Sequence, residues 1–293
     1  MRSVRSATVF TLAGMALVLA ACASGSTSTS ASASPGQSEG QYLALGDSVA
    51  FGYTPPAVTP LATYSDAANF VGYPELVAKA TGFHDSNASC SGEATGAFIS
   101  LTSTDDNGCH SGYRLRYPLH VAYKTSQLDY AVTFLKTHHN TELVTINLGA
   151  NDVFHLAVTC GGDQTCITNG LQGVLATNQQ NLESIFGALR GAGYQGKIVA
   201  LTYYSGDYNP GKTAGTIALN QPIIDAAKGY HVIIASGFDA FAPLANAHGG
   251  SSCAAGLLIA LPAGGCDVHP TSLGHSLLSA AIVNAISDGT GSY

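Results

Sequence analysis

Tryptophan is absent from the 293-residue chain, and only 10% of its residues are charged. Nothing therefore indicates a sugar-binding platform built on indole rings. The low charge and the 46% of hydrophobic residues exclude a disordered chain and provide for a large core. The 11 lysines and arginines are too few and too scattered for a nucleic-acid surface, and the formal net charge is −7.

A long membrane-spanning run is also lacking. The most hydrophobic stretch, residues 7–21, is about fifteen residues long, which is too short for a typical span. It follows two arginines, Arg2 and Arg5, and ends at Leu19-Ala-Ala-Cys22. This pattern predicts a signal peptide over residues 1–21 and resembles the lipobox of bacterial lipoproteins, where Cys22 becomes the acylated N-terminus. Several acyl chains would hold the exported protein on a membrane, and plain secretion is the alternative.

The rest of the chain reads as a tether and one domain. Residues 22–40 are mostly serine, threonine, alanine and glycine, which cannot bury a core and predict a flexible tether. Residues 41–293 have the length of an ordinary α/β domain and contain no internal repeat. We expect this domain to be a monomer.

The cysteine count is odd. Seven cysteines leave six once Cys22 is lipidated, and export predicts that the six form three disulfides. Six cysteines allow fifteen pairings, which sequence alone does not separate. We expect neighbour pairing, which would close three short Gly-rich loops, and the spacings match no zinc pattern. The expected pairs are Cys90–Cys109, Cys160–Cys166 and Cys253–Cys266.

Hydrophobic patterns predict alternating strands and helices. The predicted strands are residues 41–46, 85–89, 142–148, 197–203 and 231–235, and the predicted helices are 69–82, 126–137, 167–189, 213–228 and 272–287. Residues 237–270 read as a long loop. Strands that alternate with helices at this spacing predict a parallel sheet with helices on both faces.

The main candidate for chemistry is Ser48, in the stretch Gly46-Asp-Ser48. An apolar run typical of a buried strand ends just before it. Ligands of open α/β sheets bind outside the carboxyl ends of the strands, which is where Ser48 would lie. Taken alone the signal is weak, since a serine after a strand is more often a helix N-cap.

Two later stretches supply what a nucleophilic serine needs. Asn151 follows a second predicted strand, and His269 stands after an acid and before a proline. Histidine is the usual base that takes a serine proton at neutral pH. The oxyanion that then forms needs pre-aimed donors. The Ser48 N–H, an N–H in a glycine turn and the Asn151 amide would supply three.

These stretches, in this order, resemble the SGNH hydrolases, the family of GDSL-type esterases and lipases. Gly46-Asp-Ser48 matches the family's first block, Gly149-Ala-Asn-Asp152 matches its Gly-x-Asn-Asp, and His269-Pro-Thr-Ser-Leu-Gly-His275 matches its last block. The resemblance implies a flavodoxin-like three-layer α/β fold, with about five parallel strands and helices on both faces. The paired-cysteine loops resemble those of secreted bacterial esterases in the family.

The same resemblance assigns site residues. It implies that Ser48 is the nucleophile, that His269 is the general base, and that Ser48, Gly92 and Asn151 form the oxyanion hole. Gly92 lies in a Cys-Ser-Gly turn, and Gly96 is the alternative glycine. No metal and no organic cofactor is expected.

The catalytic acid departs from the family pattern. The family places it three residues before the histidine, where this chain has Cys266, and Asp267 is only two residues before. Asp267 can still reach the imidazole, because residues i and i+2 share a side of an extended chain. Alternatively, a backbone carbonyl near Cys266 orients the ring. The sequence leaves both accounts open.

The function implied is hydrolysis of carboxylic esters, acting on a small-molecule or lipid ester. One alternative is an acetyl esterase or O-acyltransferase that acts on polysaccharide. Another is a non-catalytic, surface-binding lipoprotein on a hydrolase fold. The sequence does not define the acyl chain length.

Overall fold

The computed structural model describes residues 40–288 of the chain. The predicted signal peptide, Cys22 and nearly all of the predicted tether lie outside the described residues. Five strands form one parallel sheet in the order β2-β1-β3-β4-β5, which confirms the predicted fold class. The strands are β1 (Gln41–Gly46), β2 (His84–Asn87), β3 (Thr141–Asn147), β4 (Lys197–Leu201) and β5 (Val232–Ala235).

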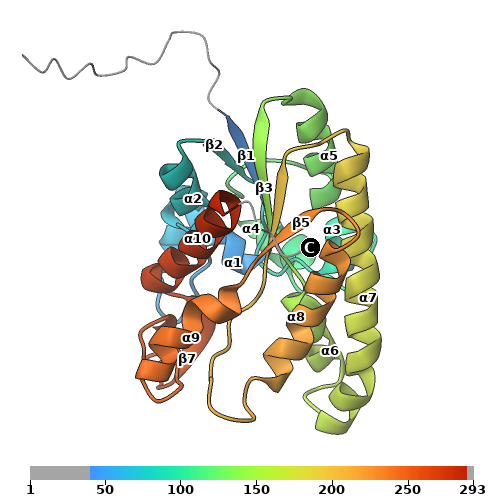
Figure 1. The fold of residues 1–293 in the computed structure, drawn as a ribbon. Coiled ribbons are helices and arrows are strands. Elements are labelled where there is room, and N and C mark those ends of the chain that lie inside the picture. The colour runs from blue at the N-terminus through green and yellow to red at the C-terminus, as the bar shows by residue number, and fades with distance from the viewer. Residues whose placement is uncertain (1–39, 289–293) are drawn as a thin grey trace, which may run out of the picture. The chain divides into compact units, whose positions relative to one another are not determined.

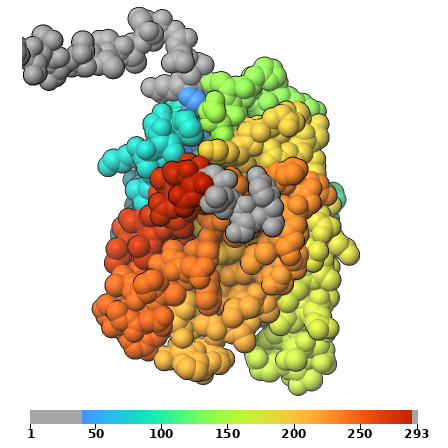
Figure 2. Space-filling view, in the orientation of Figure 1, coloured from blue at the N-terminus to red at the C-terminus, as the bar shows by residue number. Residues whose placement is uncertain are grey.

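Helices cover both faces of the sheet (Figure 1). On one side lie α2 (Tyr73–Thr81), α9 (Gly237–Ala247) and α10 (Ser272–Ser287). On the other lie α3 (Thr95–Ile99), α5 (Gln127–Thr137), α7 (Gln164–Gly191) and α8 (Ala214–Ala227). In the space-filling view α9 and α10 lie side by side on the face toward the viewer (Figure 2).

Shorter elements follow the carboxyl ends of β1, β2 and β3. They are the helices α1 (Ser48–Phe51), α4 (Arg114–Arg116) and α6 (Ala150–Thr159), and the helical turns η1 (Leu61–Ser65), η2 (Ala67–Asn69) and η3 (Cys109–Tyr113).

Burial on both faces explains why β1 reads as a continuous apolar run. Tyr42, Leu43, Ala44 and Leu45 are fully buried, as expected for an inner strand of a covered parallel sheet. The helix ends also follow sequence signals. The Ser126 hydroxyl caps α5 by accepting from Asp129 N, and the Thr271 hydroxyl caps α10 in the same way.

The expectation of a loop over residues 237–270 is wrong. This region contains α9 and a two-stranded antiparallel sheet of β6 (Leu258–Ala260) and β7 (Cys266–Pro270). The glycines, alanines and internal Pro243 of α9 hide its helical period, and β6 has only three residues. Helix α6 was not predicted either, because only two residues separate it from β3 and its first residue is followed by the polar pair Asn151 and Asp152.

The six cysteines form three disulfides, Cys90–Cys109, Cys160–Cys166 and Cys253–Cys266. Disulfides of this kind indicate an oxidising compartment, and hence export. Within residues 40–288, no helix is both long enough and apolar enough to cross a membrane.

Candidate active site

Ser48 is the first residue of α1, immediately past the carboxyl end of β1. The turn that delivers it requires glycine at position 46, where φ is +134° and a Cβ atom would lie 2.3 Å from the Asn147 carbonyl oxygen. Asp47 caps α1, since its Oδ1 accepts from Val49 N at 2.9 Å. The local sequence therefore fixes the serine at the edge of the sheet.

His269 approaches Ser48 from β7, across 221 positions of the sequence. Its Nε2 lies 2.9 Å from Ser48 Oγ, within hydrogen-bond distance. The ring also lies against Tyr53, with the two ring centroids 4.9 Å apart. The structure thus brings together the two side chains that the sequence placed at opposite ends of the domain.

Asp267 contacts the other ring nitrogen of His269. Its Oδ1 forms a close hydrogen bond with Nδ1 and also accepts from the His269 backbone N–H at 3.0 Å. This bond to His269 holds the pKa of Asp267 below its ordinary value, against the opposing effect of burial. Positions i and i+2 do share a side of β7, and this geometry favours Asp267 over a backbone carbonyl near Cys266 as the partner of the imidazole.

Gly92 and Asn151 lie on neighbouring segments. Asn151 is almost fully buried at the start of α6, and its Nδ2 donates to the Glu93 carbonyl oxygen at 3.0 Å. Gly92 has φ +87°, and a Cβ there would lie 2.7 Å from the Asn107 carbonyl oxygen. Among residues 40–288, neither the Ser48 N–H nor the Gly92 N–H donates to another protein atom. The N–H of the alternative glycine, Gly96, is already bonded to Asp105 at 2.9 Å.

Asn107 orients the Asn151 amide. Its Nδ2 donates to Asn151 Oδ1 at 2.8 Å, so the Asn151 oxygen faces Asn107 and its NH₂ group faces the Gly92–Glu93 backbone. Nothing in the sequence singles out Asn107, which lies in a polar segment without a period. The one indication is the Cys90–Cys109 disulfide. Cys109 lies two residues after Asn107, so the disulfide links the segment of Asn107 to the glycine turn.

A buried polar network lies behind the glycine turn. Gln127 accepts from Gly46 N at 2.6 Å, and its Nε2 donates to Glu93 Oε2 at 3.0 Å. Glu93 also pairs with His110 at 3.2 Å. Burial raises the pKa of Glu93, and the pKa of His110 is raised because the Glu93 carboxylate outweighs the opposing effect of burial. This network joins the end of β1 to the glycine turn.

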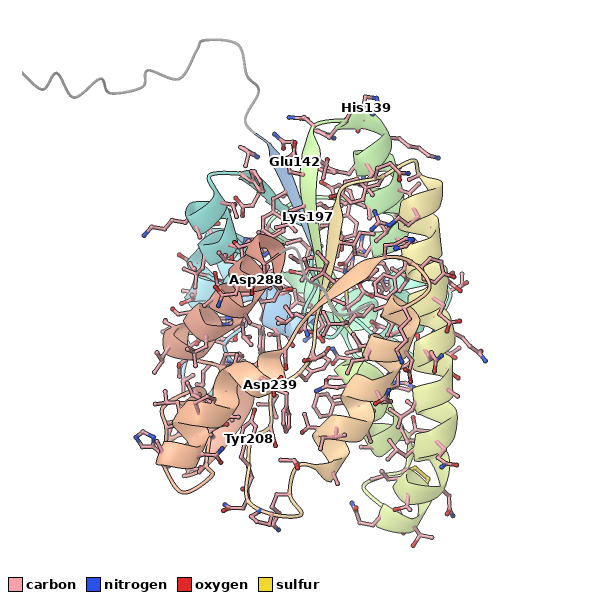
Figure 3. The ribbon with its side chains drawn as sticks, in the orientation of Figure 1. His139, Glu142, Lys197, Tyr208, Asp239 and Asp288 are labelled. Carbon is pink, nitrogen blue, oxygen red and sulfur yellow. A yellow bond between two sulfur atoms is a disulfide. The ribbon has the colours of Figure 1, made fainter. Side chains whose placement is uncertain are left out.

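Tyr203 joins Ser48's turn to the start of α6. Its hydroxyl donates to Asp47 Oδ2 at 2.5 Å and accepts from Ala150 N at 3.2 Å. Burial raises the pKa of Asp47 from 3.8 to about 6, even though Tyr203 and Val49 donate to the carboxylate. The loop after β4 that carries Tyr203 also contacts α9. The hydroxyl of Tyr208, on this loop, donates to the carbonyl oxygen of Phe238 in α9 at 2.7 Å (Figure 3).

Two other groups have structural explanations. His275 is buried, which lowers its pKa to about 3 and keeps the ring neutral. Cys90, Glu93 and Cys109 lie close enough to resemble a metal site, but both cysteines are oxidised in a disulfide and cannot act as thiolate ligands.

A pocket of about 630 Å³ opens at Ser48, Asn151 and His269. Its size lies within the range of small-molecule sites. The walls come from α6, α7, α8, the loop after β4, and β7 with its Cys253–Cys266 disulfide.

Solved structures share the fold of this chain. A five-stranded parallel sheet between two helical layers is the fold of SGNH hydrolases, and solved structures share it. The phospholipase A1 of Streptomyces albidoflavus aligns with a TM-score of 0.54 at 20% identity, over 85% of this chain and all (100%) of its own. The extracellular lipase of Streptomyces rimosus aligns with 0.52 at 20% identity, over 84% and 99%. A variant of the acetyl-xylooligosaccharide esterase of Geobacillus stearothermophilus aligns with 0.52 at 16% identity, over 84% and 94%.

The sequence identifies the family. Residues 44–277 match the GDSL-like Lipase/Acylhydrolase family, and the chain belongs to it. No curated protein matches the chain. The family resemblance predicted from the sequence is confirmed, and the protein is a carboxylic ester hydrolase.

The raised pKa of Asp47 makes a prediction about stability. Because the folded pKa of about 6 exceeds the ordinary 3.8, the folded state binds this proton more tightly than the unfolded chain does. The resulting stabilisation is fully present below about pH 3.8 and is lost as the pH rises through 6. Between pH 4 and pH 7, the free energy of unfolding of Asp47→Asn should therefore rise relative to that of the wild type by on the order of 2–3 kcal/mol. Urea unfolding of both proteins across this range measures the difference between their unfolding free energies. A difference that does not change with pH would contradict the raised pKa of Asp47.

Proposed function

We propose that the protein hydrolyses carboxylic esters through an acyl-enzyme on Ser48. The observation that carries the proposal is the bonded series Ser48 Oγ, His269 and Asp267, with Ser48 Oγ 2.9 Å from His269 Nε2. A serine bonded to a histidine that is itself held by a carboxylate is an activated nucleophile.

Acylation is the first half of the proposed reaction. His269 Nε2 takes the Ser48 proton while Ser48 Oγ attacks the ester carbonyl carbon. Asp267 holds the ring and stabilises its positive charge. When the tetrahedral intermediate collapses, the alcohol leaves with the proton from His269, and the acyl group remains on Ser48.

Deacylation repeats these steps with water. His269 takes a proton from water as the water oxygen attacks the acyl-enzyme carbonyl. The second intermediate releases the carboxylic acid, and the proton returns from His269 to Ser48 Oγ.

Three donors would stabilise the oxyanion in both halves. The N–H groups of Ser48 and Gly92 have no protein acceptor among residues 40–288, so both are available. Asn151 Nδ2 carries two hydrogens, and the one not directed to Glu93 O is the third donor. Asn107 acts through Asn151, as a positioning residue that prevents the amide from turning its oxygen toward the oxyanion.

The proposal includes the location of the protein. We propose that export removes residues 1–21, that Cys22 is acylated, and that residues 22–40 tether a monomeric hydrolase to the membrane surface. The three disulfides support export. Cys22 lies outside the described residues, so its lipidation rests on the sequence pattern alone.

Substitution of the nucleophile tests the proposal. Ser48→Ala removes the attacking oxygen, so kcat for p-nitrophenyl ester hydrolysis should fall roughly 10⁴-fold or more. The variant should keep the wild-type circular dichroism spectrum, since Ser48 is half-buried at a helix start and its backbone is unchanged. Activity like that of the wild type in a folded Ser48→Ala protein would end the proposal.

Removal of Asp267 separates the two accounts of His269 orientation. If the carboxylate holds the imidazole, Asp267→Ala should lower kcat by a factor of a hundred or more, on the order of what triad carboxylates contribute. Asp288→Ala removes an exposed carboxylate at the far end of α10 and serves as the matched control (Figure 3). A loss under tenfold for Asp267→Ala would instead assign the orientation to a backbone carbonyl near Cys266.

A double-mutant cycle tests Asn107. Asn151→Ala should cost on the order of a hundredfold or more in kcat, as for other oxyanion donors. Asn107→Ala should cost about tenfold or more in kcat with little change in KM. Because Asn107 acts only through Asn151, adding Asn107→Ala to Asn151→Ala should change kcat little further. Independent, additive losses would show that Asn107 does not work by orienting this amide.

A further inference from the structure

The part of the pocket beyond Ser48 is enclosed by apolar side chains from three helices. Val153 and Phe154 come from α6, Leu171 and Leu175 from α7, and Leu219 from α8. Leu171 and Leu175 are four residues apart and therefore share a face of α7. On α8, Gly215 lies one turn before Leu219, and a Cβ at Gly215 would meet open space. The helices thus leave an apolar space between them.

This region offers few groups for binding a sugar. The Tyr203 hydroxyl is used by Asp47 and Ala150, and the Tyr204 hydroxyl already donates to Val268 O at 2.6 Å. Apart from the residues at the reaction centre, Thr216 and Lys212 are the remaining lining residues with a hydroxyl or a charge. A polysaccharide needs several convergent polar partners, and this lining does not provide them.

The apolar space adjoins the reaction centre. The leaving alcohol must receive its proton from His269 Nε2 and therefore lies toward β7. The oxyanion would face Asn151, the second residue of α6, so the acyl group takes the remaining position on the carbonyl carbon, and the apolar lining of α6 begins at Val153. Two lining residues at the opening, Phe154 and Val268, are 44% and 53% exposed, so apolar surface extends from the pocket to solvent.

We infer that the substrates are esters of medium-length or longer unbranched fatty acids, with the acyl chain lying between α6, α7 and α8. This inference rests on the proposed function and adds its substrate class. It excludes an acetyl ester of a polysaccharide as the main substrate, because an acetyl group would leave this apolar surface in contact with water.

A chain-length series tests the inference. kcat/KM should be measured for p-nitrophenyl acetate, butyrate, octanoate and dodecanoate, with detergent to keep the longer esters dispersed. Each methylene group moved from water into the apolar pocket should raise kcat/KM by up to about fourfold until the pocket is filled. Octanoate should therefore exceed acetate by at least a hundredfold, and release of acetate from acetylated xylan should be far slower than octanoate hydrolysis.

Substitutions in the wall locate the acyl chain. Leu175→Trp should fill the space between the helices, lowering octanoate kcat/KM at least tenfold and leaving acetate within about twofold. Ile217→Trp is the matched control, because Ile217 lies on α8, is 52% exposed and does not line the pocket. It should leave the whole series unchanged.

The outcomes separate the inference from the proposed function. If acetate is hydrolysed as fast as octanoate and the activity depends on Ser48, the inference is wrong and the hydrolase proposal stands. If octanoate is preferred but Leu175→Trp leaves that preference intact, the chain lies elsewhere and the assignment to α6, α7 and α8 is wrong. If the wild type hydrolyses none of these esters, the proposed function itself fails.

Discussion

The contact between Ser48 and His269 is the constraint on which the rest of the site depends. Ser48 follows the end of the first strand, β1, and His269 lies on the last strand, β7, so their 2.9 Å separation requires both segments to be held in place. The parallel sheet holds Ser48, because β1 is an inner strand between β2 and β3. His269 lies outside this sheet, on β7, which is held by pairing with β6 and by the Cys253–Cys266 disulfide. The two-stranded sheet and the disulfide thus hold the histidine in place, as the main sheet holds the serine.

The surroundings of the site are held by buried polar groups with defined partners. Asp47, Glu93 and Asn151 are almost fully buried, and each is hydrogen-bonded to a different segment of the chain. Burying such groups is costly unless they are paired, so each network favours one arrangement of its segments over others. Tyr203 connects Ser48's turn to α6, and Gln127 connects the same turn to the segment around Gly92. These hydrogen bonds between distant segments therefore position the proposed oxyanion donors as well as the proposed nucleophile.

Much of the fold could be predicted from the sequence, and the reasons are physical. The bounds of β1 and α10 are as predicted. Strand β1 is an uninterrupted run of buried residues, and α10 has a threonine N-cap and a well-defined C-terminus. Helices α6 and α9 were missed, because polar residues begin α6 and small residues with a proline fill α9. The main chemical candidates lie in short blocks that are visible in the sequence. Asn107, Gln127 and Tyr203 are not visible there, because their roles depend on contacts between segments that lie far apart in the chain.

The most direct test of the central claim is covalent labelling of the serine. A fluorophosphonate reacts with a serine only when a base removes its proton, so the label reports the Ser48–His269 contact without requiring knowledge of the substrate. The account predicts that the wild-type protein takes up one label per molecule, that peptide mass spectrometry places it on Ser48, and that a folded His269→Ala protein labels at least a hundredfold more slowly. Labelling at another residue, or labelling of Ser48 at the same rate without His269, would contradict the account.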